Sequence, residues 1–310
     1  MIFDLLTVAA AFLVSVALYP LLIKALRRMG IGQVIQVEMA EEHQRKRGTP
    51  TGGGVLFIAL GITGGLLSLI VHRGALVATV ALLLFGALGL LDDAAKLHIG
   101  QVGIPARLKL PLQLVLAIPV VILAHGPQHL LPESVSWLYW PLALVAVVGT
   151  VNAVNFNDGL DGLAGGQTVI AMLALVLLLP GAGAGEKAVA MTLVGGLLGF
   201  LVYNRYPARI FMGDAGALGL GGALAAMALQ QGWVVLLPLV ALVPAIEVVS
   251  VILQVTHFKL TRGRRIFRDS PIHLAFQKDG WSEPRIVVTF WATGLVAALL
   301  AGWLARAVLP

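Results

Sequence analysis

Ten apolar runs, each long enough to cross a lipid bilayer as a helix, constrain the fold of this chain more than any other feature. They occupy residues 2–23, 52–71, 75–91, 108–125, 137–155, 163–180, 186–203, 214–231, 233–256 and 286–309. Apolar residues make up 59% of the 310 residues and charged residues only 12%, which lies outside the range of soluble domains. The sequence therefore predicts an all-α integral membrane protein of about ten transmembrane helices, in a single polytopic domain covering residues 1–310.

Lysine and arginine divide unequally between the two sets of loops that these spans create. One set contains only Arg73, Lys187 and Arg306, whereas the other contains all the remaining bases. Because loops rich in Lys and Arg face the cytoplasm, the basic set is expected to be cytoplasmic and both termini extracytoplasmic. This distribution explains the formal charge of +6 without a nucleic acid partner.

Five aspartates lie on three connections of the cytoplasmic set: Asp92, Asp93, Asp158, Asp161 and Asp214. Taken singly, adjacent acids at a span end, an Asn-Asp-Gly turn and a helix N-cap each have a structural explanation. Gathered on one side of the bilayer, the five resemble an oxygen-ligand site for Mg²⁺. The chain has no cysteine, so thiolate ligands and a cysteine nucleophile are excluded.

Two cytoplasmic loops carry groups that bind phosphate. Residues 45–54, RKRGTPTGGG, combine bases, hydroxyls and a glycine run, and residues 257–285 contain a cluster of bases followed by His273. Contact with anionic lipid headgroups is the alternative for the bases, and a structural hydrogen bond is the alternative for His273. Gln254 lies in the ninth span, where a polar group is expected to face the bundle interior.

Carboxylates that hold Mg²⁺, bases that bind phosphate and an adjacent bilayer together indicate phosphoryl transfer from a soluble nucleotide-linked donor to a lipid acceptor. An acceptor that is itself a lipid phosphate needs no nucleophile from the protein. A membrane transporter is the alternative from another class, because Glu247 within a span and glycine-broken helices also suit one. A transporter predicts polar residues at the midplane of several spans, whereas here the acids gather at the cytoplasmic ends.

Several motifs occur in a fixed order along most of the chain: RGTPTGGG, LDD, NAVNFNDGLDGLAGG, YNRYPARIFMGDAG, EVVSVILQ, RRIFRDSPIH and GWSEPRIVVTFW. In this order they resemble the polyprenyl-phosphate hexosamine-1-phosphate transferases. The resemblance implies Mg²⁺-dependent transfer of phospho-MurNAc-pentapeptide from UDP-MurNAc-pentapeptide to undecaprenyl phosphate, giving lipid I and UMP for peptidoglycan synthesis. It also implies a multi-pass protein of the bacterial inner membrane, in contact with membrane lipids and forming a homodimer. A sister enzyme that uses UDP-GlcNAc is the alternative within the family.

The resemblance also implies roles for individual residues. The catalytic residues would be Asp92, Asp93, Asp214 and His273, and the three aspartates would bind Mg²⁺, with Asp214 as the main ligand. The residues implied in substrate binding are Lys46, Thr51, Asn152, Asn155, Asp158, Asp161, Phe211 and Gln254.

Two of the family's motifs are altered in this chain. His273 is followed by Leu274 and Ala275, where the family has two further histidines, and Ala217 stands where a serine is usual. These replacements bear on substrate contacts and leave the five aspartates unchanged.

Overall fold

The computed structural model describes residues 2–32, 48–99, 103–124, 130 and 132–308. Within these residues the regular structure is helical, and an isolated bridge between Gly32 and Pro50 is the only β pairing. The helices are α1 (Ile2–Arg28), α3 (Gly54–Leu69), α4 (Leu76–Ile99), α5 (Ala106–Leu123), α6 (Tyr139–Asn157), α7 (Leu163–Leu173), α8 (Ala184–Asn204), α9 (Asp214–Gln230), α10 (Leu237–Val240), α11 (Leu242–Leu260), α12 (Ile272–Lys278) and α13 (Glu283–Val308).

Seven helices in the described part of the chain are long and apolar enough to cross a membrane: α1, α4, α5, α6, α8, α11 and α13. Two more, α3 and the segment Leu163–Leu178, are apolar but shorter. Large apolar side chains are exposed along α1, α5 and α13, a pattern that a soluble protein avoids and a lipid-facing surface requires. The prediction of an all-helical integral membrane protein is confirmed.

The helix α9 forms the centre of the bundle. Every residue from Ala215 to Leu229 is buried, and the helix packs against α3, α4 and α6. Glycines allow this approach, because a Cβ added to Gly89 of α4 would lie 2.2 Å from the Asp214 carbonyl oxygen. Close packing of small residues therefore fixes the start of α9 against the carboxyl-terminal half of α4.

Two predicted helix boundaries are wrong. The helix α4 does not end near Leu91 but continues to Ile99, so the two aspartates that follow Leu91 lie on a helix. The predicted span 233–256 is interrupted at Ala241, whose φ of −112° and ψ of 46° are not helical. In a continuous helix the ring of Pro244 would clash with the carbonyl of Val240, which explains the break.

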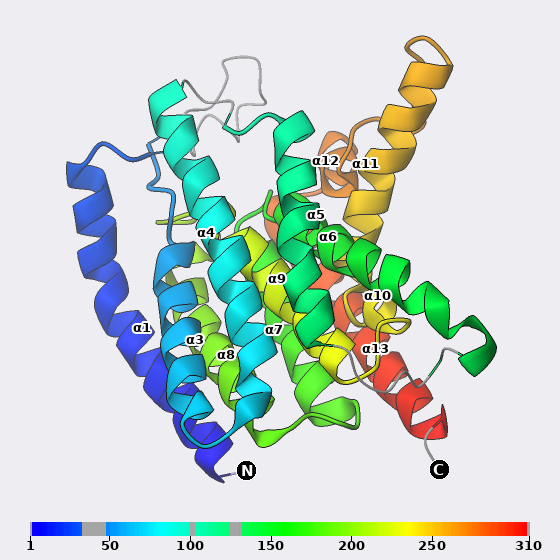
Figure 1. The fold of residues 1–310 in the computed structure, drawn as a ribbon. Coiled ribbons are helices and arrows are strands. Elements are labelled where there is room, and N and C mark those ends of the chain that lie inside the picture. The colour runs from blue at the N-terminus through cyan, green and yellow to red at the C-terminus, as the bar shows by residue number, and fades with distance from the viewer. Residues whose placement is uncertain (1, 33–47, 100–102, 125–129, 131, 309–310) are drawn as a thin grey trace.

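The two ends of the chain lie at the same end of the bundle. Figure 1 shows the start of α1 and the end of α13 there, with the end of α4 and the start of α5 at the opposite end. An even number of crossings has this consequence.

Candidate active site

Three aspartates and two lysines meet where α4, α5 and α9 converge, and we call them the aspartate–lysine cluster: Asp92, Asp93, Lys96, Lys109 and Asp214. The Lys96 Nζ lies 3.1 Å from Asp92 Oδ2 and 2.9 Å from Asp214 Oδ1. The Lys109 Nζ lies 3.2 Å from Asp92 Oδ2 and 2.6 Å from Asp214 Oδ2. Each ammonium group therefore bridges the same two carboxylates, which offsets the mutual repulsion of the acids.

Asp93 fixes the position of Asp214. Its Oδ1 accepts a hydrogen bond from the Asp214 backbone N–H and its Oδ2 accepts one from Ala215, both at 3.0 Å. A carboxylate at this place satisfies two otherwise unpaired donors and the positive end of the helix dipole of α9. Gly213, with φ of 78°, precedes the helix, and a Cβ there would lie 2.8 Å from Asp93 Oδ2.

Asp92 orders the connection that carries Lys109 into the cluster. Its side chain is 3% exposed, and its Oδ1 accepts a hydrogen bond of 2.6 Å from the Ile104 backbone N–H. Gly103 makes this turn with φ of 64°. The backbone at Ile104, just before α5, is thereby held against the Asp92 carboxylate.

The two predicted asparagines lie on α6 and make different contacts. The Asn155 Nδ2 donates to Asp214 Oδ1 at 3.2 Å, so this residue joins the cluster. The Asn152 Nδ2 donates to Gln113 Oε1 at 2.6 Å and to the Val148 carbonyl at 2.8 Å. Asn152 thus connects α6 to α5 one turn before the cluster.

Asp158 and Asp161 lie on the turn between α6 and α7. Asp158 ends α6 with φ of −84° and ψ of 43°, and a turn follows it. Asp161 is buried, and its Oδ2 accepts a hydrogen bond of 2.8 Å from the Ala208 backbone N–H. The structure therefore places Asp161 outside the cluster, where it holds the segment 205–213 that leads to Asp214.

Phe211 and Thr51 lie on two connections that run side by side. The Phe211 N–H donates to the Pro50 carbonyl and the Gly53 N–H donates to the Phe211 carbonyl, both at 2.8 Å. Thr51 is half-buried between these two bonded positions. The first predicted phosphate-binding loop thus reaches the segment before Asp214, and Lys46 lies outside the described residues.

Gln254 holds the last loop against α11. Its Oε1 accepts hydrogen bonds of 3.0 Å from the backbone N–H groups of Ile266 and Phe267, and its Nε2 donates to the Phe267 carbonyl at 3.1 Å. All the hydrogen bonds described for the Gln254 side chain go to this loop. The structure therefore gives Gln254 a role in positioning the loop.

The Gln254→Leu variant is expected to destabilise the protein by about 1 kcal/mol, because two partly buried backbone N–H groups lose their acceptor. The loosened loop should also raise KM for the donor. Thermal unfolding in detergent and steady-state kinetics measure the two effects. Gln230→Leu is the matched control, since Gln230 donates to the Gly74 carbonyl near the opposite end of the bundle. An equal rise in KM for both variants would contradict the positioning role.

A cavity of about 220 Å³ opens beside Gln254, lined by Gln254, Val255, Phe258, Lys259, Arg265, Asp269 and Ser270. Partial burial acts to raise the pKa of Asp269, but hydrogen bonds from the Lys278 ammonium and the Ser270 N–H outweigh burial and lower it. Asp269 is therefore ionised at neutral pH. Asp269 and the two bases Lys259 and Arg265 therefore give the cavity charges of both signs.

His273 connects α12 to two other parts of the site. Its side chain is buried, its Nδ1 lies 3.2 Å from Glu247 Oε1 on α11, and a Cβ added to Gly159 would lie 2.3 Å from its Nε2. Ile272 and Phe276 of the same helix pack against an apolar cluster formed by Leu160, Leu163, Val243, Ile286, Val287 and Phe290. The structure thus places His273 against the Asn157–Gly162 turn, and it pairs the intramembrane acid Glu247.

Lys96 and Lys109 are the site residues that sequence reasoning missed. The sequence contained one signal, because Lys96 follows Asp92 by four residues and Asp93 by three, and both spacings bring side chains together on a helix. Lys109 had none, since its partners Asp92 and Asp214 are 17 and 105 residues away.

Comparison with known proteins identifies the family. The model of glycosyl transferase family 4 matches residues 75–232, which include the whole aspartate–lysine cluster. The phospho-N-acetylmuramoyl-pentapeptide-transferase of Halalkalibacterium halodurans is 42% identical over 97% of both chains. Proteins of the same name from Bacillus thuringiensis and Bacillus cereus are 40% identical over 96% of both chains. The chain therefore belongs to glycosyl transferase family 4 and, within it, to the phospho-N-acetylmuramoyl-pentapeptide-transferases.

Proposed function

We propose that the protein transfers phospho-MurNAc-pentapeptide from UDP-MurNAc-pentapeptide to undecaprenyl phosphate, forming lipid I and UMP. The aspartate–lysine cluster carries this proposal, because two partly buried lysines and three aspartates converge in the region that the family model matches. The names of the relatives support the same reaction. The place of the reaction would be the cytoplasmic face of the bacterial inner membrane.

In this reaction an oxygen of the lipid phosphate attacks the β-phosphorus of the donor. The bond from that phosphorus to the bridging oxygen breaks, and UMP leaves with the electron pair. The acceptor is already an anion, so the protein needs to align the two phosphates and neutralise their charge. Lys96 and Lys109 supply positive charge for this task, and Asp93 sets the position of Asp214.

Mg²⁺ is proposed as the cofactor, with Asp214 as its main ligand and Asp92 and Asp93 beside it. Among the residues that the structure describes, no three His, Asp or Glu side chains form a ready metal cage. Mg²⁺ is commonly bound by one or two carboxylates together with substrate phosphate oxygens and water. Asp92 and Asp214 already bind two positively charged groups, the ammonium groups of Lys96 and Lys109. When bound, the metal would neutralise charge on the diphosphate.

The proposed topology has ten crossings with both termini extracytoplasmic. The seven long helices supply seven crossings, and α3, α9 and the segment Leu163–Leu178 would supply the other three. The common position of the chain ends in Figure 1 and the uneven distribution of bases support this arrangement. The aspartate–lysine cluster then lies on the cytoplasmic side, where the soluble donor is available.

Comparison of two donors tests the proposal. Purified protein with undecaprenyl phosphate and Mg²⁺ is expected to release UMP from UDP-MurNAc-pentapeptide and not from UDP-GlcNAc, with EDTA as the control. Release from the muramyl donor would also show that Leu274 and Ala275 are compatible with activity. Turnover of UDP-GlcNAc alone would replace this proposal with the sister reaction, and no release from either donor would contradict both.

A further inference from the structure

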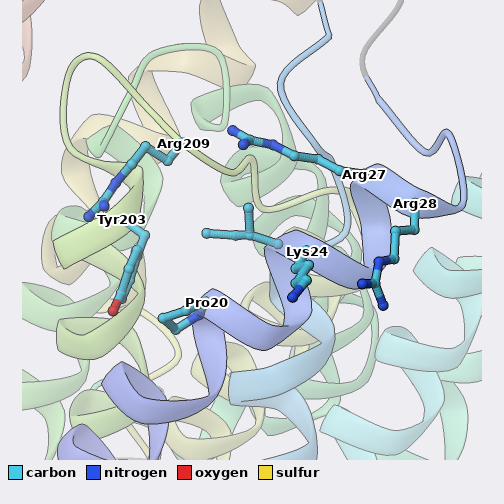
Figure 2. Close-up of a pocket in the computed structure, with 7 residues that line it drawn as sticks. Pro20, Lys24, Arg27, Arg28, Tyr203 and Arg209 are labelled. Atoms are coloured by element: carbon cyan, nitrogen blue, oxygen red, sulfur yellow. The ribbon is translucent and has the colours of Figure 1, made fainter.

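A cavity of about 570 Å³ lies between the end of α1 and the end of α8, apart from the aspartate–lysine cluster. It is lined by Pro20, Ile23, Lys24, Arg27, Arg28, Tyr203 and Arg209 (Figure 2). No residue of the cluster and no residue with a predicted role in the reaction lines it. The reaction proposed above therefore leaves this cavity without a function.

The cavity carries positive charge that nothing in the described chain neutralises. Four of its lining residues are Lys or Arg and none is acidic. Among the described residues none of these four bases forms an ion pair, and the side chain of each is exposed. Bases gathered without counter-charges raise the local concentration of anions, so the cavity favours an anionic ligand.

One wall of the cavity is fixed by contacts between α1 and α8. The Tyr203 hydroxyl donates a hydrogen bond of 2.8 Å to the Val16 carbonyl, and its ring lies 4.5 Å from the Arg209 guanidinium. Arg209 also donates from Nη2 to the Val202 carbonyl at 3.3 Å. Figure 2 shows Tyr203 and Arg209 across the cavity from the bases of α1. The position of Arg209 is therefore set by the fold.

The other part of the cavity continues into the apolar surface of a membrane-spanning helix. Pro20 and Ile23 line it on α1, and Leu13, which lies two turns before Pro20 on the same side of the helix, is exposed. A ligand that matches both parts has a phosphate group at the bases and hydrocarbon chains along α1. Bases at the end of a span attract anionic lipid headgroups in this way.

We propose that this cavity binds the phosphodiester headgroup of an anionic membrane phospholipid, at a site separate from the catalytic one. The site also adjoins the segments that carry the reaction, because the Tyr19 hydroxyl donates to the Gly53 carbonyl at 2.9 Å and Gly53 donates to Phe211. The bound lipid therefore stabilises the contact of α1 with α8 and with the connection before Asp214. The assignment requires α1 to cross the membrane and does not depend on the transfer reaction.

Lipid binding to the purified protein in detergent tests the proposal. Native mass spectrometry with phosphatidylglycerol is expected to show binding that is about 30-fold weaker in the Arg27→Gln/Arg209→Gln variant than in the unmodified protein. The matched control is Arg73→Gln/Arg306→Gln, which removes two exposed arginines at the end of the bundle opposite the cavity. The control is expected to bind the lipid as the unmodified protein does.

Four outcomes would overturn the proposal. An equal loss in the control would mean that overall positive charge attracts the lipid. Equal binding of neutral phosphatidylcholine would exclude a role for the charged headgroup, and equal competition by glycerol phosphate would identify a soluble phosphate as the ligand. If the double variant unfolds at a lower temperature without lipid, Arg27→Gln alone is expected to weaken binding about fivefold, and unchanged binding would also contradict the site. No donor is present, so failure of the transfer proposal would not affect this result.

Discussion

The Asp214→Asn variant is expected to reduce kcat for lipid-dependent UMP release by at least about 100-fold while the protein remains folded. Asp214 accepts hydrogen bonds from both lysines of the cluster and from Asn155, so it holds these groups around one point. Asparagine keeps the shape of the side chain but removes the charge that would bind Mg²⁺ and one of the two oxygens. Its backbone N–H still donates to Asp93, which preserves the start of α9.

Single-turnover kinetics and thermal unfolding separate the chemical effect from a folding effect. Asp279→Asn is the matched control, because Asp279 is an exposed aspartate paired with Arg268 outside the cluster. Its kcat is expected to stay within about twofold of the unmodified value, as is usual for exposed ion pairs. Near-normal turnover by Asp214→Asn would exclude Asp214 as the main ligand of a catalytic metal.

The Gly89→Ala variant is expected to lose about 3 kcal/mol or more of stability and most of its activity. The added Cβ would lie 2.2 Å from the carbonyl oxygen of Asp214 and 2.6 Å from the Cα of Ala215. Both are backbone atoms, so a side-chain rotation cannot relieve the clash. The helices α4 and α9 must then move apart, which separates Asp214 from the two aspartates and Lys96 on α4.

Gly149→Ala is the matched control for this effect. Gly149 lies inside α6, and a Cβ there would meet no atom within 4 Å. Alanine is the better helix former by about 1 kcal/mol, so this variant is expected to be as stable as the unmodified protein or slightly more so. Thermal unfolding and UMP release measure both variants. Equal behaviour of the two would contradict the packing argument for the site.

The features that sequence predicts best here are those that depend on local pattern. Runs of apolar residues indicated the helices, and the aspartate motifs indicated the end of the bundle where the site lies. Asp92, Asp93 and Asp214 were predicted as one group, and the structure brings them together. Composition could not place the break at Ala241, because apolar residues continue on both sides of it and the break comes from the geometry of Pro244.

The parts that could not be predicted depend on contacts between distant segments. Lys109 was counted among the cytoplasmic bases, and only the packing of α5 beside α9 makes it a partner of Asp214. Asp161 was grouped with the other aspartates by its motif, yet its carboxylate holds the Ala208 N–H. A motif identifies which residue types are present, and tertiary packing decides whether each one faces the substrate or supports a neighbouring loop.

Transfer of the sugar phosphate itself is the most direct measurement of the central claim. Donor labelled with ³²P at the β-phosphate is incubated with the protein, undecaprenyl phosphate and Mg²⁺, and the lipid fraction is extracted. The account predicts one labelled phosphate in the lipid for each UMP released, with no transfer after EDTA or in Asp214→Asn. Label that stays in the aqueous phase, or equal transfer by the unmodified protein and Asp214→Asn, would contradict the assignment of the aspartate–lysine cluster as the catalytic centre.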